Sequence, residues 1–187
     1  MQMDYLKIAI NDIQYLKGAK GCISIYANTN NLCTQTQQIV EKLFKHVLCL
    51  NNVDGKFDKE LRTHSLSKLY ESLLGLVGED KDTLDYRLLN KLSDTYINGR
   101  YPGDSYTSYT EEDFNKFYSL LEDILSWLKD GVLDEGSIQY LTESSLITSD
   151  NKEYQNCKTS KESGLNKIVD VTGLVNEGKF DSLKNLL

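Results

Sequence analysis

Apolar residues recur every three or four positions along most of the first 131 residues. Because an α-helix completes a turn about every 3.6 residues, this spacing gathers them on one helical face. The clearest case is segment 32–48, whose apolar positions are separated by Gln, Glu, Lys and His. The pattern predicts five helices, over residues 4–20 (extending to about Tyr26 if glycines are tolerated), 32–48, 65–77, 83–98 and 110–131.

Polar and glycine-containing segments separate these stretches. Short polar side chains at 28–31 and 51–55 favour breaks between helices, because they compete for backbone hydrogen bonds. Thr110 precedes three acidic residues, which is typical of a helix N-terminus. No alternation of apolar and polar residues indicates a strand in this region. The expected fold is all-α, an up-and-down antiparallel bundle of about five helices.

Residues 132–187 have a different pattern. They are richer in Ser, Thr, Asn and Gly, and their apolar residues occur in short clusters. Short helices near 137–143 and 178–187 and a strand near 167–171 are compatible with these clusters. The apolar content exceeds that of a disordered linker, so this segment is expected to pack on the bundle or on a partner. We therefore predict a helical domain over 4–131 and an irregular C-terminal extension over 132–187.

The composition favours a helical protein outside the membrane. Pro102 is the only proline, so almost no residue interrupts a helix. No apolar run reaches the roughly 20 residues of a membrane span, and the first residues lack the features of a signal peptide, which predicts a cytoplasmic protein. The four cysteines show no metal-binding spacing, and neither a metal nor another cofactor is expected. The net charge of -7 argues against nucleic-acid binding through bulk charge, but it is compatible with a local basic pocket.

Four polar residues of segment 32–48 share one predicted helical face: Gln38, Glu41, Lys42 and Lys45. One interpretation is a solvent-exposed face, in which Glu41 and Lys45 form an i, i+4 pair of small energetic effect. The alternative is a groove in which the two lysines bind a phosphate group. Taken alone, the stripe favours the solvent-exposed face.

Two further positions have the chemistry of an anion site. His64 comes just before the helix that begins near Ser65, where free backbone N–H groups also favour an anion. The alternative is a loop histidine that caps the helix or packs on the bundle. Arg100 follows a glycine and precedes Tyr101 and Pro102, so a rigid turn fixes its direction and suits bidentate phosphate binding. The alternative is an arginine that caps the carbonyls of the preceding helix.

Four local motifs, in their order along the chain, resemble the HEPN family, all-helical domains named for their occurrence in higher eukaryotes and prokaryotes. The resemblance covers residues 4 to about 130. The motifs are an aspartate in the first helix, paired glutamines with Glu-Lys and a later Lys, Thr-His-x-Leu, and a tyrosine followed by Arg-Tyr-Pro. In this sequence they are Asp12, Gln37-Gln38 with Glu41-Lys42 and Lys45, Thr63-His64-Ser65-Leu66, and Tyr96 with Arg100-Tyr101-Pro102.

The resemblance implies a helical bundle, a homodimer, a nucleotide or RNA as ligand, and often a separately encoded nucleotidyltransferase as partner. On this interpretation, cationic side chains bind phosphate, a tyrosine is available to stack on a base, and further residues support them. The phosphate-binding candidates are Lys42, Lys45, His64 and Arg100, the stacking candidates are Tyr96 and Tyr101, and the supporting residues are Asp12, Gln38, Glu41 and Pro102.

Ribonuclease members of this family carry an arginine and then, about four to six residues later, a histidine. The arginines here are Arg62, Arg87 and Arg100, and neither His46 nor His64 follows one of them at that spacing. We therefore expect a binding module with no catalytic residue. Two alternatives remain: a toxin-like ribonuclease with a degenerate site made of Arg100 and His64, and a purely structural dimerisation module.

Overall fold

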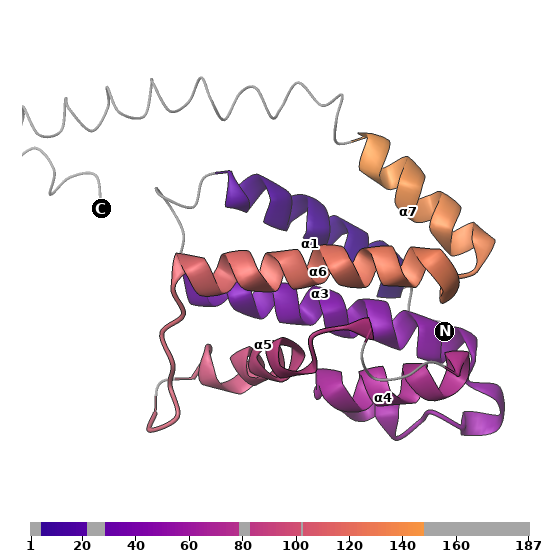
Figure 1. Ribbon diagram of the computed structural model, residues 1–187, viewed down its shortest axis with the longest axis horizontal. Coiled ribbons are helices and arrows are strands. Elements are labelled where there is room, and N and C mark those ends of the chain that lie inside the picture. Colours follow the sequence, from indigo (N-terminus) through magenta and orange to yellow (C-terminus); the bar gives the residue numbers. More distant parts are fainter. Residues whose placement is uncertain (1–4, 22–28, 79–82, 102, 148–187) are drawn as a thin grey trace, which may run out of the picture. The chain divides into compact units, whose positions relative to one another are not determined.

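The computed structural model describes residues 5–21, 29–78, 83–101 and 103–147. The described residues up to Ser145 form one compact unit. The described residues contain six α-helices and no strand, which confirms the predicted all-α fold. The helices are α1 (Tyr5–Lys20), α3 (Thr29–Leu50), α4 (Leu66–Val77), α5 (Tyr86–Asn98), α6 (Glu111–Gly131) and α7 (Glu135–Ile147), with two 3₁₀ turns, Val53–Gly55 and Glu60–Arg62, between α3 and α4 (Figure 1).

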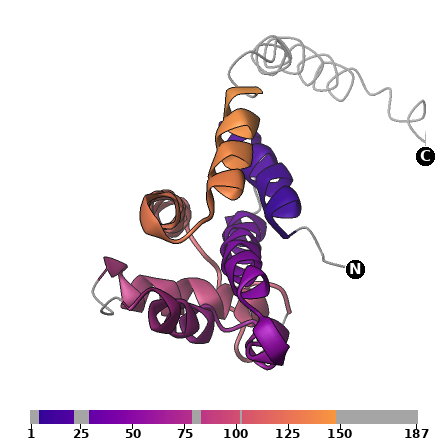
Figure 2. The same ribbon diagram turned by 90° about the vertical axis from the view of Figure 1, so that its right-hand side faces the viewer.

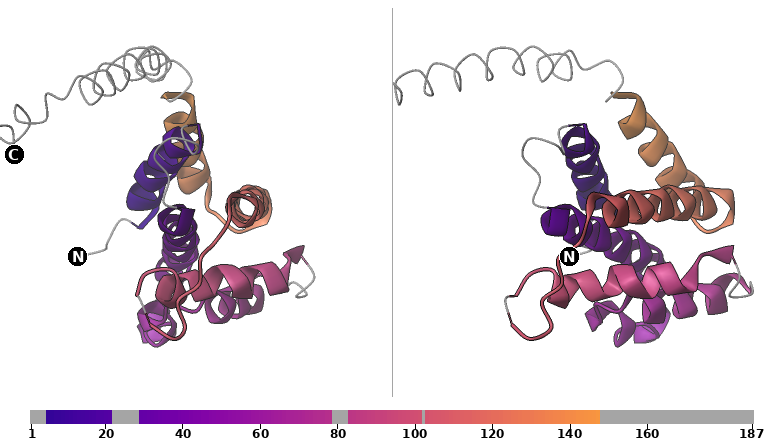
Figure 3. Two further views of the ribbon diagram at one scale, coloured as in Figure 1. Left: turned by 90° about the vertical axis from the view of Figure 1, so that its left-hand side faces the viewer. Right: turned by 60° about the vertical axis from the view of Figure 1, so that its left-hand side comes forward.

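The long helix α3 is the centre of the bundle, and α1, α4, α5 and α6 all pack against it. Figures 2 and 3 show α1 and α5 on opposite sides of α3. Helix α3 can contact several neighbours because its buried residues are spread over more than one face: Leu32, Cys33, Ile39, Val40, Leu43, Phe44, Val47 and Leu48. Some of its polar positions therefore also face other helices.

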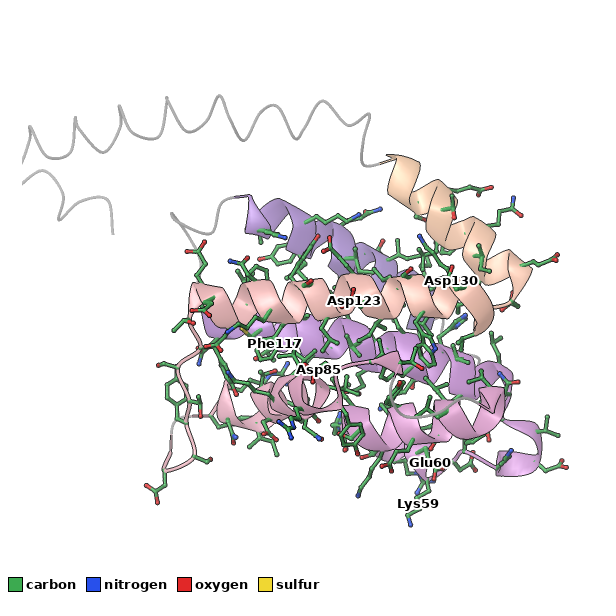
Figure 4. All side chains as sticks on the ribbon, viewed as in Figure 1. Lys59, Glu60, Asp85, Phe117, Asp123 and Asp130 are labelled. Atoms are coloured by element: carbon green, nitrogen blue, oxygen red, sulfur yellow. The ribbon has the colours of Figure 1, made fainter. Side chains whose placement is uncertain are left out.

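An aromatic cluster joins three helices at the core. The Phe44 ring of α3 stacks on Tyr70 of α4 with 6.1 Å between ring centroids, and Trp127 of α6 forms a T-shaped pair with each of these rings. Offset and edge-to-face pairs of this kind contribute about 0.5–1.5 kcal/mol beyond the area that they bury. Figure 4 shows side chains filling the space between α6 and the helices below it, where Phe117 is fully buried.

Helix α4 runs in the same direction as α3. Gln37 of α3 contacts His64, just before α4, and Phe44, further along α3, contacts Tyr70. This orientation is possible because the connection over 51–65, with its two 3₁₀ turns, returns the chain to the middle of α3. Helix α5 then runs antiparallel to α4, since the hydroxyl groups of Tyr86 and Ser93 bond to Glu71 and to the Leu66 N–H respectively.

The helix ends follow side-chain chemistry that is visible in the sequence. Thr110 forms the predicted N-cap of α6, with a reciprocal capping box to Asp113. Gly78 ends α4 in the left-handed conformation at φ 72°, which glycine adopts without steric cost. Helix α5 begins at Tyr86, three residues later than predicted, because the Asp85 carboxylate accepts the free N–H groups of its first turn.

The start of the C-terminal extension is helical. Helix α7 covers the short helix predicted at 137–143 and is longer at both ends. Asp134 precedes it and accepts hydrogen bonds from the backbone N–H and the hydroxyl of Ser137. No helix in the described ranges is long and apolar enough to span a membrane. Outside the described residues lie Cys22, Tyr26, Pro102, Cys157 and the elements predicted at 167–171 and 178–187.

Candidate functional site

A line of buried polar residues runs along α3. Asn30, Thr34, Gln37, Glu41 and Lys45 follow one another at steps of three or four residues, and each is less than 10% exposed. They therefore share one helical face, which looks toward α5 and the loop before α4. We call these five residues the polar seam. Buried polar groups need hydrogen-bond partners, and the partners of the seam are the segments that carry the predicted site residues.

The first half of the polar seam binds the end of α5 and the loop that follows it. The Asn30 side chain donates to the Thr107 carbonyl at 2.7 Å and accepts from the Tyr109 N–H at 2.8 Å. The Thr34 hydroxyl donates to the Thr95 carbonyl at 3.2 Å. These bonds fix the backbone on both sides of the arginine predicted to bind phosphate.

The second half of the polar seam centres on the Glu41 carboxylate. It accepts a hydrogen bond from Lys45 Nζ at 2.9 Å and one from Gln37 Nε2 at 2.9 Å, and it lies 3.0 Å from His64 Nδ1. Gln37 Nε2 also donates to the His64 carbonyl at 3.3 Å. The His64 backbone carbonyl and the Nδ1 edge of its imidazole ring are thus both held from α3.

Burial alone raises the pKa of the Glu41 carboxyl, but Lys45, Gln37 and His64 favour its charged form and bring the pKa below its ordinary value. Glu41 is therefore a carboxylate at neutral pH. An imidazole whose Nδ1 faces a carboxylate keeps a defined ring orientation and leaves Nε2 available to another group.

His64, Tyr96 and Arg100 form a stack at the surface. The His64 and Tyr96 rings are nearly parallel, 11° apart, with 4.3 Å between centroids, and the Tyr96 hydroxyl lies 3.4 Å from His64 Nε2. The Arg100 guanidinium carbon lies 5.0 Å from the Tyr96 ring centroid. The His64 side chain is half exposed and Arg100 is exposed, so both can reach a ligand.

The two lysines predicted to bind phosphate each meet a carboxylate of the protein. Lys45 is buried against Glu41, and Lys42 forms an ion pair with Asp12 of α1 at 2.6 Å. The motif aspartate thus joins α1 to α3. Arg100 has no ion-pair partner in the part of the chain that the structure describes. Its positive charge is therefore available, and that of the lysines is largely balanced.

The remaining predicted residues lie around this stack or outside the described ranges. Tyr101 is 61% exposed, whereas Tyr96 is already covered in part by His64. Gln38 and Arg100 line one shared cavity. Gly99 is the C-cap of α5. Its N–H donates to the Thr95 and Ile97 carbonyls, so backbone hydrogen bonds satisfy these carbonyls at the end of the helix. Pro102 is not among the described residues.

Arg62 lies apart from the stack. It lines a cavity of about 530 Å³ between the second 3₁₀ turn and α4, which His64 does not line. Lys59 and Glu60, labelled in Figure 4, lie at the same cavity. Glu60 and Glu71 line this cavity together with lysine and arginine side chains, so the lining carries charges of both signs.

Sequence reasoning missed Asn30 and Thr34, and it did not assign a role to Gln37. A signal was present, because all five seam residues occur at helical spacing within one predicted helix or its N-terminal flank. Their burial depends on α5 and on the loop before α4, which come from distant parts of the sequence. No group of three His, Cys, Asp or Glu side chains that could hold a metal ion occurs in the described ranges.

Gly99 allows the end of α5 to approach α3 closely. A Cβ at this position would lie 2.8 Å from the Thr95 carbonyl oxygen and 3.1 Å from Thr34 Oγ1. We expect Gly99→Ala to lower the free energy of unfolding by about 1–3 kcal/mol, the usual cost of overpacking. Urea denaturation measures this loss, and Gly103→Ala is the matched control, since no atom lies within 4 Å of its added Cβ. Equal stabilities of the two variants would contradict this interpretation of the contact.

The described unit is thus an all-helical bundle that presents a histidine, a tyrosine and an arginine from two helix ends. The model of the HEPN domain matches residues 4–131, and the chain belongs to this family. Membership implies a nucleotide-binding or ribonuclease-like module. No significant match was found among curated proteins, nor among solved structures.

Proposed function

We propose that the helical bundle is a nucleotide-binding module in which Arg100 and His64 bind phosphate groups. The observation that carries the proposal is the exposed Arg100 guanidinium, which contacts the same Tyr96 ring that His64 stacks on and has no carboxylate partner in the described ranges. A guanidinium has a rigid fork of donors that matches two phosphate oxygens.

The neighbouring groups complete such a site. His64 Nε2 is on the side of the ring away from Glu41, where it can donate to a phosphate oxygen or accept from a hydroxyl. Tyr101 is exposed next to Arg100 and can stack on a base. Lys42 and Lys45 support the site by fixing Asp12 and Glu41, since their ammonium groups are already bound.

The module is further proposed to act as a homodimer, or together with a separately encoded nucleotidyltransferase, as the family resemblance implies. Exposed apolar and aromatic side chains at the end of α5 and in the next loop, Ile97, Tyr101 and Tyr106, are available for such a contact. Light scattering coupled to size-exclusion chromatography distinguishes a dimer from a monomer.

The test of nucleotide binding is the thermal stability of the protein with ATP or GTP. A ligand at about 100 times its Kd stabilises the folded state by about 2.7 kcal/mol, which for this chain length is a rise in Tm of roughly 5–10 °C. We expect Arg100→Ala to remove this rise. Arg87→Ala, a loss of the same charge from the exposed start of α5, is expected to keep it.

Absence of any Tm change with ATP, GTP or a short RNA would contradict the proposal. An equal loss in both arginine variants would show that only the net charge matters.

A second function, metal-independent RNA cleavage, is favoured by one observation. The Glu41 carboxylate orients His64 as it would orient a general base, with Nε2 left on the half-exposed side. Purified protein would then degrade RNA in the presence of a chelator, and His64→Gln would abolish the degradation. RNA that stays intact with the wild-type protein rejects this alternative. A stable dimer that neither binds nucleotides nor cleaves RNA would instead support a purely structural dimerisation module.

A further inference from the structure

A separate cavity of about 210 Å³ lies between α1 and the first half of α3 and extends to Arg100. Its polar lining comes from Tyr15 of α1, from Asn31, Thr34, Gln35 and Gln38 of α3, and from Arg100. Among the described residues, no carboxylate lines it, and Arg100 is the only ionised side chain at it. A cation is therefore a poor occupant, whereas a neutral hydrogen-bonding group attached to an anion suits this charge distribution.

Three carboxamides dominate one wall of the cavity. Asn31, Gln35 and Gln38 follow at steps of four and three residues, so their side chains emerge from one face of α3. A carboxamide presents a donor and an acceptor side by side, which matches the edge of a nucleobase. Phosphate alone would use only the donors.

One of these carboxamides has an unmet requirement. The Gln35 Oε1 atom is buried and has no hydrogen-bond partner within the described ranges. A buried acceptor without a donor is unfavourable, so a rotation of the Gln35 carboxamide toward an occupant that presents an N–H group would stabilise the site. Every nucleobase carries such a group beside an acceptor, and a carboxamide pairs with adenine through its N6 donor and an adjacent ring nitrogen.

The size and the rim of the cavity agree with a single base. Its volume is below the roughly 300–1,000 Å³ of sites for drug-sized ligands, so it fits only a fragment of such a molecule. The Tyr15 ring lines the cavity and is 64% exposed, which leaves a face for stacking. Arg100 lines the cavity and also lies on Tyr96, so it connects the cavity with the His64 side of the molecule.

We propose that this cavity binds the base of a nucleotide, with Gln35 and Gln38 as the residues that recognise its edge. The proposal rests on the proposed function in one respect, since Arg100 binds the phosphate of the same ligand. It adds a second group of contacts that distinguishes a nucleotide from a phosphate chain alone. Adenine is the base expected to bind most tightly.

The test compares the Kd values of ATP, UTP and inorganic tripolyphosphate, measured by calorimetry on the full chain. We expect ATP to bind about tenfold to a hundredfold more tightly than tripolyphosphate, the contribution of one well-formed bidentate contact. Gln35→Leu is expected to bring the ATP and tripolyphosphate values together while leaving the tripolyphosphate value unchanged. Gln38→Leu is a second variant with the same expectation, in case the first lowers stability.

Gln139→Leu is the control, because Gln139 is exposed on α7 and its side chain donates to Glu143 of the same helix. Equal Kd values for ATP, UTP and tripolyphosphate in the wild-type protein would overturn the base pocket. If tripolyphosphate binding then still required Arg100, the phosphate site would stand without it. Absence of binding by all three ligands would overturn both proposals.

Discussion

Glu41→Gln is expected to lower the free energy of unfolding by about 3–5 kcal/mol, the usual effect of removing one partner from a buried ion pair. The change keeps the shape of the side chain but leaves the ammonium group of Lys45, only 7% exposed, without its counter-charge. Chemical denaturation of the two proteins at pH 7 measures the difference.

Glu112→Gln is the matched control for this variant. Glu112 and Lys116 form a pair at the same i, i+4 spacing and at 2.7 Å, but both side chains are more than half exposed. Such exposed pairs contribute little to stability because solvent screens them, so the control is expected to retain nearly all of its stability. The double variant Glu41→Leu with Lys45→Met should recover much of the loss, because it removes both charges. A Glu41→Gln protein as stable as the control would contradict the buried pair.

The difference in unfolding free energy between the wild type and Glu41→Gln is expected to change with pH in a defined direction. The pKa of Glu41 is lower in the folded protein than in the unfolded chain, so its charge favours folding. This contribution is complete above the unfolded pKa of about 4.3 and is lost as the pH falls through the folded value. The stability difference between wild type and Glu41→Gln is therefore expected to shrink in acid.

Asn30→Ala is expected to cost ~2–4 kcal/mol, because each stranded buried group costs about 1–3 kcal/mol. It removes the acceptor of the buried Tyr109 N–H and the donor to the Thr107 carbonyl. Denaturation measures the loss, and the Tm rise with ATP should also become smaller, since these bonds hold the segment around Arg100. Asn51→Ala is the control, because Asn51 is exposed and its side chain bonds to the Val47 carbonyl alone.

A small effect of Asn30→Ala, equal to that of Asn51→Ala, would mean that the loop before α6 is held by other contacts. If Asn30→Ala loses the expected stability but its Tm still rises with ATP as in the wild type, Asn30 stabilises the fold without positioning the ligand site. Either result would show that the polar seam does not position Arg100.

The helices could be predicted because their signals are local. Periodic apolar residues define α3 and α6, and caps such as Thr110 and Gly78 define ends through their own backbone and side-chain chemistry. The direction of α4 was not given by any local signal, because it depends on how far the loop over 51–65 returns. The start of α5 could be predicted only by recognising Asp85 as its N-cap.

For the candidate site, the sequence indicated which residues belong to it but not which of them contact one another. Glu41, Lys45, His64, Tyr96 and Arg100 could be selected from the sequence, but their pairing could not. A lysine in an amphipathic pattern has the same spacing whether its ammonium group faces solvent, a phosphate or a buried carboxylate. Only the packing of α4 and α5 on α3 decides among the three, and the contacts quoted for the site join residues as far as 23 and 61 positions apart in the chain.

The most direct measurement of the central claim uses the two histidines as reporters. Only His46 and His64 contribute imidazole signals to a ¹H–¹⁵N spectrum, and His64→Gln assigns them. His46 lies at the other half of α3, beside Ser137 of α7. Titration with ATP is predicted to shift the His64 signals and to leave those of His46 in place. Unchanged His64 signals at an ATP concentration that raises the Tm would contradict a phosphate site at His64 and Arg100.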